Sequence, residues 1–297
     1  MIRYLKGMRM KKIFKLFMCL VMIISVFITS GCKKDSMEGI TIYSTVYPIE
    51  YITETLYGDY SDVYSIYPNE VIELTDKLIA DYSNSNLFVY NGLSNEKDYA
   101  VKMLNKNKNL RIVDATMGME VLYSDPELWL NPSNFLMLCL NIRNGMKEYI
   151  TNSFLRKEID SNYDKLKLEI SELDAEIKLL IENADSKTIL VSNNVFKFFE
   201  KYGLEVISVF NDENLTDKTI SLVKDAINDE KVKHIIMFEN DTLTDEVEKI
   251  ISDNNIEKIY FDSLTTLSSE NQTSGKDYLS VMNSNLEILK KELYKSE

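Results

Sequence analysis

The stretch KEIDSNYDKLKLEISELDAEIKLLIEN, residues 157–183, decides the fold expected for this chain. It contains no glycine or proline, and its apolar residues recur at steps of three and four from Ile159 to Leu180. That spacing predicts a single helix of about 27 residues, roughly 40 Å long. Such a helix is longer than one small lobe can use, so we expect it to pack across two lobes.

Short apolar runs alternate with longer amphipathic runs on both sides of this helix, a pattern that predicts α/β architecture. Before the helix, strands are expected over residues 39–44, 61–66, 86–90 and 110–114, and helices over 49–56, 73–82, 98–105 and 132–149. After it, strands are expected over 188–191, 205–209, 232–239 and 258–262, and helices over 195–202, 216–229, 244–254 and 278–294. The sequence therefore predicts two β/α lobes, residues 39–156 and 184–297, with a ligand cleft between them.

The composition excludes several classes of protein. The 297 residues are 45% hydrophobic, which is enough for well-packed cores. The formal net charge of -13 argues against nucleic acid as a partner, because nucleic-acid binders usually present a basic face. With three Cys and one His, a zinc site built from several of these ligands cannot be assembled.

The N-terminus has the pattern of a bacterial lipoprotein signal. Residues 1–32 hold six basic residues and no acidic one, and Leu16 to Ile28 is an apolar run whose only polar member is Ser25. The run ends in Thr29-Ser30-Gly31-Cys32, which resembles a lipobox, although Thr29 stands where Leu is usual; an uncleaved signal anchor is the alternative. We expect a signal peptide over 1–32, lipidation at Cys32 and a tether over 33–38. The chain would then be lipid-anchored on the extracytoplasmic face of the cell membrane.

Five motifs follow one another along the rest of the chain: Thr45-Val46-Tyr47-Pro48-Ile49, Leu87-Phe88-Val89-Tyr90-Asn91-Gly92-Leu93, Asp125-Pro126-Glu127-Leu128-Trp129-Leu130-Asn131-Pro132, Phe198-Phe199-Glu200-Lys201-Tyr202-Gly203-Leu204 and Tyr278-Leu279-Ser280-Val281-Met282-Asn283-Ser284-Asn285-Leu286. Together they resemble the metal-binding lipoproteins of zinc and manganese ABC importers, the ZnuA/TroA-like family. The resemblance implies two β/α lobes joined by one backbone helix, with a divalent metal ion held between them. It also implies a monomer that delivers the ion to a permease and its ATPase.

Members of that family typically hold the metal with three His and one carboxylate, and here the three His are replaced. Matching the motifs puts Glu70 at the first position, with Asn69 as the alternative, and Glu127 at the second. The third position falls on Asn193, with Ser192 as the alternative, and the late carboxylate is Asp262. The only His, His234, lies in the expected strand 232–239 and matches none of these positions.

The set Glu70, Glu127, Asn193 and Asp262 would offer the metal only oxygen atoms. Oxygen ligands suit Mn²⁺, Ca²⁺ or Mg²⁺ better than Zn²⁺, which prefers nitrogen and sulfur. Without a cation the three carboxylates would repel one another and raise one another's pKa values. Three of the residues also have a structural explanation. Glu127 follows Pro126 in a turn, Asn193 could cap the helix at Val195, and Asp262 could cap Ser263 and Leu264.

Other functions give different expectations. A degenerate member of the family could bind a non-metal ligand or serve as an adhesion or interaction protein, since a fold does not fix a function. An enzyme is not expected, because the sequence has no Ser-His-Asp set, no phosphate-binding glycine loop and no His-Glu-x-x-His motif. Cys139, within an apolar run, is expected to be a buried small hydrophobe.

Overall fold

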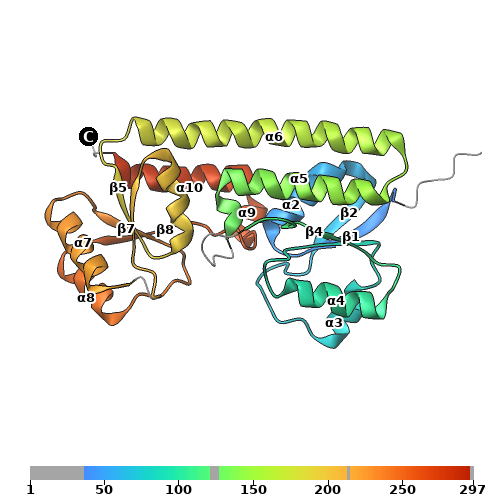
Figure 1. Cartoon of the computed structure of the whole chain (residues 1–297), viewed down its shortest axis with the longest axis horizontal. Coiled ribbons are helices and arrows are strands. Elements are labelled where there is room, and N and C mark those ends of the chain that lie inside the picture. Colours follow the sequence, from blue (N-terminus) through green and yellow to red (C-terminus); the bar gives the residue numbers. More distant parts are fainter. Residues whose placement is uncertain (1–36, 121–126, 213–214, 295–297) are drawn as a thin grey trace, which may run out of the picture. The chain divides into compact units, whose positions relative to one another are not determined.

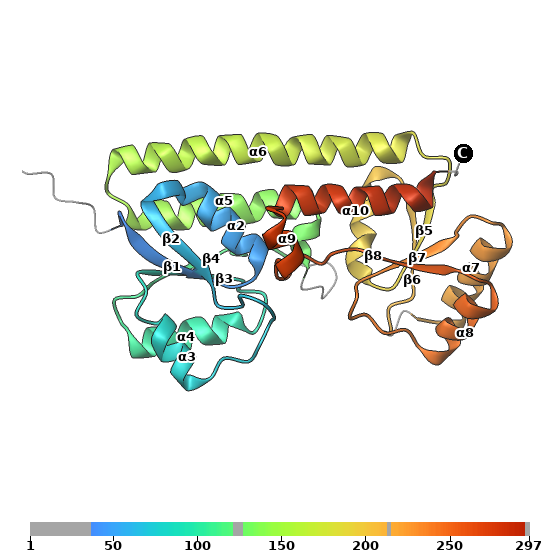
Figure 2. The same ribbon diagram turned by 180° about the vertical axis from the view of Figure 1, so that it is seen from behind.

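The first lobe is built on a parallel sheet. The computed structural model describes residues 37–120, 127–212 and 215–294 of the chain. The strands stand in the order β2-β1-β3-β4, and helices α2 and α5 lie on one face of the sheet with α3 and α4 on the other (Figures 1 and 2). The elements are β1 (Ile40–Ser44), α2 (Tyr47–Tyr57), the 3₁₀ turn η1 (Gly58–Tyr60), β2 (Ser61–Ser65), α3 (Asp76–Tyr82), β3 (Leu87–Tyr90), α4 (Glu96–Lys106), β4 (Arg111–Asp114), the 3₁₀ turn η2 (Leu128–Leu130) and α5 (Pro132–Tyr149).

The second lobe repeats this plan with a parallel sheet of strand order β6-β5-β7-β8. Its elements are β5 (Thr188–Val191), η3 (Asn194–Tyr202), β6 (Glu205–Ser208), α7 (Asp217–Asn228), β7 (His234–Met237), α8 (Asp245–Asp253), β8 (Glu257–Tyr260), α9 (Ser269–Thr273) and α10 (Tyr278–Leu293). The predicted α/β class and the two parallel-sheet lobes are confirmed. Several details differ. Helix α3 begins three residues after its predicted start, and β7 covers only the middle of the predicted strand 232–239. The helix predicted over 195–202 is the 3₁₀ helix η3, and the short elements η1, η2 and α9 were not predicted.

The long helix α6 (Ser153–Glu182) begins four residues before the predicted start. Its side-chain cap explains the earlier start, since Oδ1 of Asn152 accepts hydrogen bonds from the backbone N–H groups of Phe154 (2.9 Å) and Leu155 (3.4 Å). The buried stripe of α6 has the predicted spacing and is formed by Leu155, Ile159, Leu166, Ile170, Leu173, Ile177 and Ile181. This stripe keeps one face of the helix against the protein along its whole length.

Helix α6 contacts elements of both lobes, as the resemblance implied, and lies alongside α5 and α10 (Figures 1 and 2). Near its start, the side-chain amide of Asn162 donates to the carbonyl of Leu56, at 3.2 Å. Further along, the hydroxyl of Tyr202 in η3 donates to Asp174, at 2.6 Å. The helix thus gives both lobes a common support.

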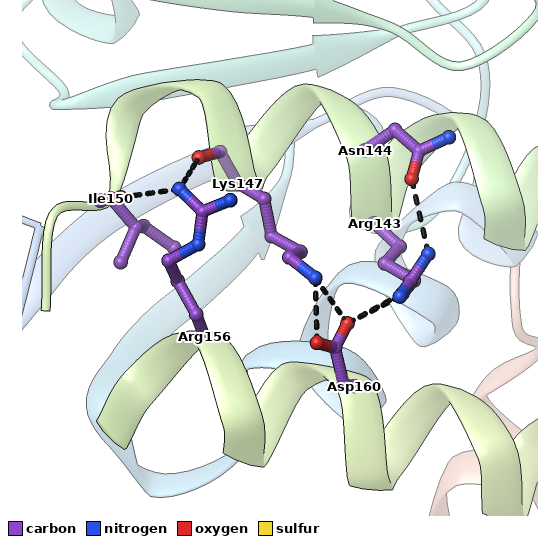
Figure 3. A network of polar contacts seen from close by, with 6 residues as sticks. All are labelled: Arg143, Asn144, Lys147, Ile150, Arg156 and Asp160. Atoms are coloured by element: carbon purple, nitrogen blue, oxygen red, sulfur yellow. Dashed lines mark hydrogen bonds and ion pairs between the residues drawn. The ribbon is translucent and has the colours of Figure 1, made fainter. Parts of the chain in front are cut away.

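A network of charged side chains fixes α6 to the first lobe (Figure 3). The carboxylate of Asp160 on α6 accepts hydrogen bonds from Nζ of Lys147 (2.5 Å) and Nε of Arg143 (2.7 Å), both on α5. The guanidinium of Arg143 also lies over the ring of Tyr163, 5.0 Å from its centroid. Burial opposes the charge on Asp160, but the two basic partners outweigh it and lower its pKa.

Several smaller predictions are also confirmed. Cys139 is fully buried, with 0% of its surface exposed. Asn131 caps α5 by accepting a hydrogen bond from the N–H of Ser133, at 3.1 Å, with Pro132 as the first helical residue. Gly203 ends η3 at a φ of 99°, a left-handed conformation that glycine adopts without steric cost.

The predicted signal peptide and lipidation site fall in a part of the chain that the structure does not describe. Residues 1–36, which include Cys32, lie outside the described ranges, so both remain predictions. Among the helices that are described, none combines the length and apolar character needed to cross a membrane.

Candidate metal centre

A cavity of about 720 Å³ lies where the first lobe meets the segment that follows β8. Its walls carry four carboxylates, and one of them is the predicted ligand Glu127. Thr265, three residues after the predicted ligand Asp262, also lines it. In open parallel sheets, ligands bind beside the carboxyl ends of the strands, and this cavity is lined by Asn91, the residue that directly follows β3.

Glu127 precedes the turn η2 and is partly buried. Its atom Oε2 is shielded from solvent. The following turn is held firmly, because Leu128, Trp129 and Leu130 are all buried. The structure therefore places the second predicted ligand on a fixed support at the edge of the cavity.

Glu96 is a carboxylate in the same cavity that sequence reasoning missed. It lies at the first position of α4, is only 6% exposed, and its Oε2 accepts a hydrogen bond from the N–H of Asn91, at 3.0 Å. Burial raises the pKa of Glu96 to about 7 against the opposing hydrogen bonds. A bound cation would offset the burial and favour the charged form.

The first predicted ligand lies in the loop between β2 and α3. Glu70 and its alternative Asn69 are both exposed to solvent. The next two residues, Val71 and Ile72, line the cavity. This loop therefore contributes to the cavity wall, but neither Glu70 nor Asn69 lines the cavity.

The third predicted ligand follows β5 in the second lobe, where polar side chains are paired with one another. Asn193 is 8% exposed, and its Oδ1 accepts a hydrogen bond from the N–H of Val195, at 3.1 Å, as its structural explanation predicted. The alternative, Ser192, is 3% exposed and donates through Oγ to the carboxylate of Asp241, at 2.5 Å. Asp241 comes shortly after β7 and was not predicted; its position after a strand end is the signal that could have found it.

The fourth predicted ligand, Asp262, follows β8 and is also paired within its own lobe. One carboxylate oxygen accepts from the N–H of Leu264 (2.8 Å) and the other from the side-chain amide of Asn271 (3.1 Å). Burial raises the pKa of Asp262, and the nearby negative charge of Glu239 raises it further. Leu264 is fully buried with a φ of 59°, a conformation that is strained for a leucine.

Hydrogen bonds join the segment after Asp262 to the first lobe. Nε1 of Trp129 donates to the carbonyl of Ser263 at 2.8 Å, and the N–H of Tyr47 donates to the carbonyl of Thr265 at 3.0 Å. The carbonyl of Trp129 in turn accepts from the hydroxyl of Tyr278, at 2.8 Å. Trp129 therefore connects the turn that carries Glu127 with the residue next to Asp262.

The predicted ligands do not form a ready-made metal centre in this conformation. Within residues 37–120, 127–212 and 215–294, no three or more His, Cys, Asp or Glu side chains are grouped so that they could hold a metal ion. Glu70, Glu127 and Asp262 are thus not gathered at one point. The four-residue site stays a prediction, and it requires the loop and lobe movements that a cation would favour.

The only histidine has a structural role, in line with its expected place outside the site. Nδ1 of His234 on β7 lies 2.6 Å from Oε2 of Glu292, a residue of α10 that is 4% exposed. Glu292 also accepts from the backbone N–H groups of Lys233 and His234. This pair fastens the last helix to the second sheet.

Comparison with known proteins supports the same family. Residues 42–292 match the model of the family described as ZnuA, zinc-uptake complex component A, periplasmic. A manganese ABC transporter substrate-binding lipoprotein, PsaA of Streptococcus anginosus, is 26% identical over 96% of this chain and 100% of its own. The high-affinity zinc uptake system protein ZnuA of Bacillus subtilis is 22% identical over 89% of this chain and 91% of its own.

A solved structure has the same fold. The crystal structure of the metal-dependent lipoprotein YcdH from Bacillus subtilis superposes with a TM-score of 0.71, at 22% identity, over 86% of this chain and 100% of its own. The motifs, the two lobes with their long helix and the family match over residues 42–292 all agree. The chain belongs to the ZnuA family.

Proposed function

We propose that this protein is the substrate-binding component of an ABC importer and that its substrate is a divalent metal ion. Relatives that align over nearly the whole chain are named as manganese and zinc transport proteins. The observation that carries the proposal is the cavity at the junction of the lobes, which is lined by the carboxylates of Glu96 and Glu127. The cavity is also lined by Glu73 and Asp98, so among the described residues of its lining four carboxylates face one basic residue, Lys102, and a captured cation would balance the remaining negative charge.

The residues proposed to hold the ion are Glu70, Glu127, Asn193 and Asp262. All four offer oxygen, so the proposed substrate is Mn²⁺, Ca²⁺ or Mg²⁺ in preference to Zn²⁺. Ser192 remains the alternative to Asn193, and Asn69 the alternative to Glu70.

Capture of the ion would exchange one set of contacts for another. Asp262 would give up hydrogen bonds from Leu264 and Asn271, and Asn193 its cap of Val195, to turn their oxygens toward the cavity. The cation would offset the repulsion among the carboxylates and so draw Glu70 and Glu127 toward the second lobe. Because α6 supports both lobes, we expect small loop and lobe shifts in place of a wide hinge closure.

The rest of the proposal concerns the setting of the protein. It would be a monomer, lipid-anchored through Cys32 on the extracytoplasmic face of the cell membrane, and would present the ion to a permease driven by an ATPase. Two acyl chains are enough for stable anchoring. We propose no catalytic role, because the matching family and the relatives are named for metal uptake and transport.

Calorimetric titration tests the proposal. The metal-stripped protein is titrated in turn with Mn²⁺, Ca²⁺, Mg²⁺ and Zn²⁺, alongside Glu127→Gln and the control Glu172→Gln on the exposed face of α6. We expect one equivalent of a hard cation to bind, with much weaker binding in Glu127→Gln and unchanged binding in the control. Absence of binding by every ion would contradict the proposal.

A further inference from the structure

A second cavity, of about 560 Å³, lies on the other side of Tyr67 from the candidate metal centre. Tyr67 lines both cavities. The walls of the second cavity come from α2, from the end of β2 and from the segment that contains α9 and leads into α10. Its volume is in the range of small-molecule sites, roughly 300 to 1,000 Å³.

Helix α2 turns an unusual face toward this cavity. Residues 47, 50, 51, 54 and 55 line it, and this spacing places them on one side of the helix. The opposite side is an ordinary core face, with Ile49, Ile52 and Leu56 buried. The cavity side alternates tyrosine with glutamate: Tyr47, Glu50, Tyr51 and Glu54.

Aromatic rings make up much of the lining. Four tyrosines contribute, namely Tyr47, Tyr51, Tyr64 and Tyr67. The ring centroids of Tyr47 and Tyr51 are 6.2 Å apart and the rings are tilted by 47°. A cation is attracted to an aromatic face when it lies within about 6 Å of the ring centroid, so one cation can approach both rings.

The charges that line the cavity are mainly negative. Glu50, Glu54 and Asp277 contribute carboxylates, whereas Lys276 is the one basic residue among the described residues of the lining. Burial, and then the charges of Asp277, Glu50 and Glu54, raise the pKa of Tyr47. The three carboxylates therefore all act on the hydroxyl of a single ring.

The pKa of Glu50 indicates that nearby positive charge does not balance the carboxylates of the cavity. Burial, and then the charge of Glu54 one turn away, raise the pKa of Glu50 to about 7. A backbone hydrogen bond from Ser65 opposes the shift without cancelling it. A cation bound beside Glu50 would favour the charged form of this carboxyl group and so release protons.

We propose that this cavity is a binding site for a small organic cation of the quaternary ammonium class. Aromatic rings attract such a cation, and the four tyrosines of the lining would supply them, while the carboxylates would balance its charge without direct coordination. A metal ion fits less well, because no three carboxylates of the described chain are grouped closely enough to hold one. The inference does not depend on the metal-binding function, because it rests on a separate cavity.

Titration of the metal-free protein with choline tests the inference. The matched compound is 3,3-dimethylbutan-1-ol, which has nearly the shape of choline but no charge. We expect choline to bind at least tenfold more tightly than the alcohol at pH 7 and to release protons on binding. Equal affinities, or no binding of choline, would overturn the inference.

Two variants locate the binding. Glu50→Gln removes the charge of a half-buried side chain but keeps its shape, and Tyr64→Leu removes a ring that is 50% exposed. Each should weaken choline binding at least fivefold. The controls are Glu172→Gln and Tyr260→Leu, the latter at a tyrosine that is 43% exposed outside the cavity. Choline binding that is insensitive to both cavity variants would contradict the assignment.

A competition experiment separates the two cavities. Choline affinity should be unchanged in Glu127→Gln and in the presence of saturating Mn²⁺. Displacement of choline by Mn²⁺ in a one-to-one manner would mean that choline occupies the metal centre, and the inference would be wrong. Choline binding to a protein that binds no metal ion would leave the inference standing while the proposed transport function fails.

Discussion

The two lobes carry similar sheets but treat the polar residues near their strand ends differently. In the first lobe, Glu96 and Glu127 line an open cavity of about 720 Å³. In the second lobe, Ser192, Asn193 and Asp262 hold hydrogen bonds within the lobe, to Asp241, Val195 and Leu264 respectively. The first-lobe carboxylates therefore face a cavity, with Glu96 also held by the N–H of Asn91, whereas the second-lobe residues are turned toward partners in their own lobe.

This difference indicates an order of events in ion capture. A cation can reach the carboxylates of Glu96 and Glu127 from the cavity that they line, but it must compete with hydrogen bonds inside the second lobe for Asn193 and Asp262. We therefore expect the first lobe to supply most of the affinity. Binding of the ion by Asn193 and Asp262 would then shift the second lobe relative to the first.

The largest effect is predicted for a change at Glu127, in the first-lobe part of the candidate site. Glu127→Gln keeps the shape of the side chain but removes its charge, and we expect the affinity for Mn²⁺ to fall about a hundredfold or more, which corresponds to roughly 2.7 kcal/mol. Isothermal titration of the variant beside Glu172→Gln measures the effect. A loss of less than threefold would mean that the first lobe does not dominate binding.

The buried carboxyl group of Glu96 in the first lobe should make the stability of the protein depend on pH. Its pKa in the folded protein, about 7, lies above the ordinary value of a glutamate, so folding favours its protonated form. Its contribution is fully favourable below the unfolded pKa and is lost as the pH rises toward 7. Glu96→Gln should therefore raise the stability of the metal-free protein at pH 8 by roughly 1 to 3 kcal/mol, with little change at pH 4. Urea unfolding at the two pH values checks this; equal effects at both would contradict it.

Variants of Asn193 separate its role as a helix cap from its proposed role as a metal ligand. Asn193→Ala removes the cap of Val195 and should cost about 1 kcal/mol in the free energy of unfolding. Asn193→Asp retains the capping oxygen and adds a negative charge, so it should keep the stability and increase the affinity for Mn²⁺. Thermal unfolding and titration of both variants separate the two roles. Lower affinity in the Asp variant would exclude residue 193 from the site.

The smallest effect is expected far from the cavity, at the contact between α5 and α6. Asp160→Asn weakens the pairs with Arg143 and Lys147, and because the carboxylate is 35% exposed the cost should stay below about 1 kcal/mol. The pKa of Asp160 is lowered, so its contribution is present at neutral pH and is lost only as the pH falls through that lowered pKa. Urea unfolding at pH 7 measures the cost, and an altered Mn²⁺ affinity would show that α6 transmits changes to the site.

The spacing of apolar residues predicted most of the fold. Helix α6 buries one regular stripe of apolar side chains, and the strands appear in the sequence as short apolar runs. The start of α6 was misplaced, since it depends on one capping side chain, Asn152, outside the apolar pattern. The helix predicted over 195–202 is present as the 3₁₀ helix η3, a type that the prediction did not specify. Its predicted apolar residues are present, but spacing alone does not separate a 3₁₀ helix from an α-helix over so short a segment.

The candidate site was predicted less completely than the fold. Motif matching placed Glu127, which does line a cavity. Burial of Glu96 could not be read from its polar sequence neighbours, because it results from the packing of α4 beside β3. The link from Trp129 to Ser263 joins residues 134 positions apart, and such a contact leaves no mark in local sequence.

The most direct test of the account is a crystal structure of the protein grown with Mn²⁺, with the ion located from its anomalous scattering. The account predicts one strong peak between the lobes, ligated by oxygens of Glu127 and Asp262, with Asp262 released from Asn271. A peak at His234, a peak bound by one lobe alone, or no peak would contradict it.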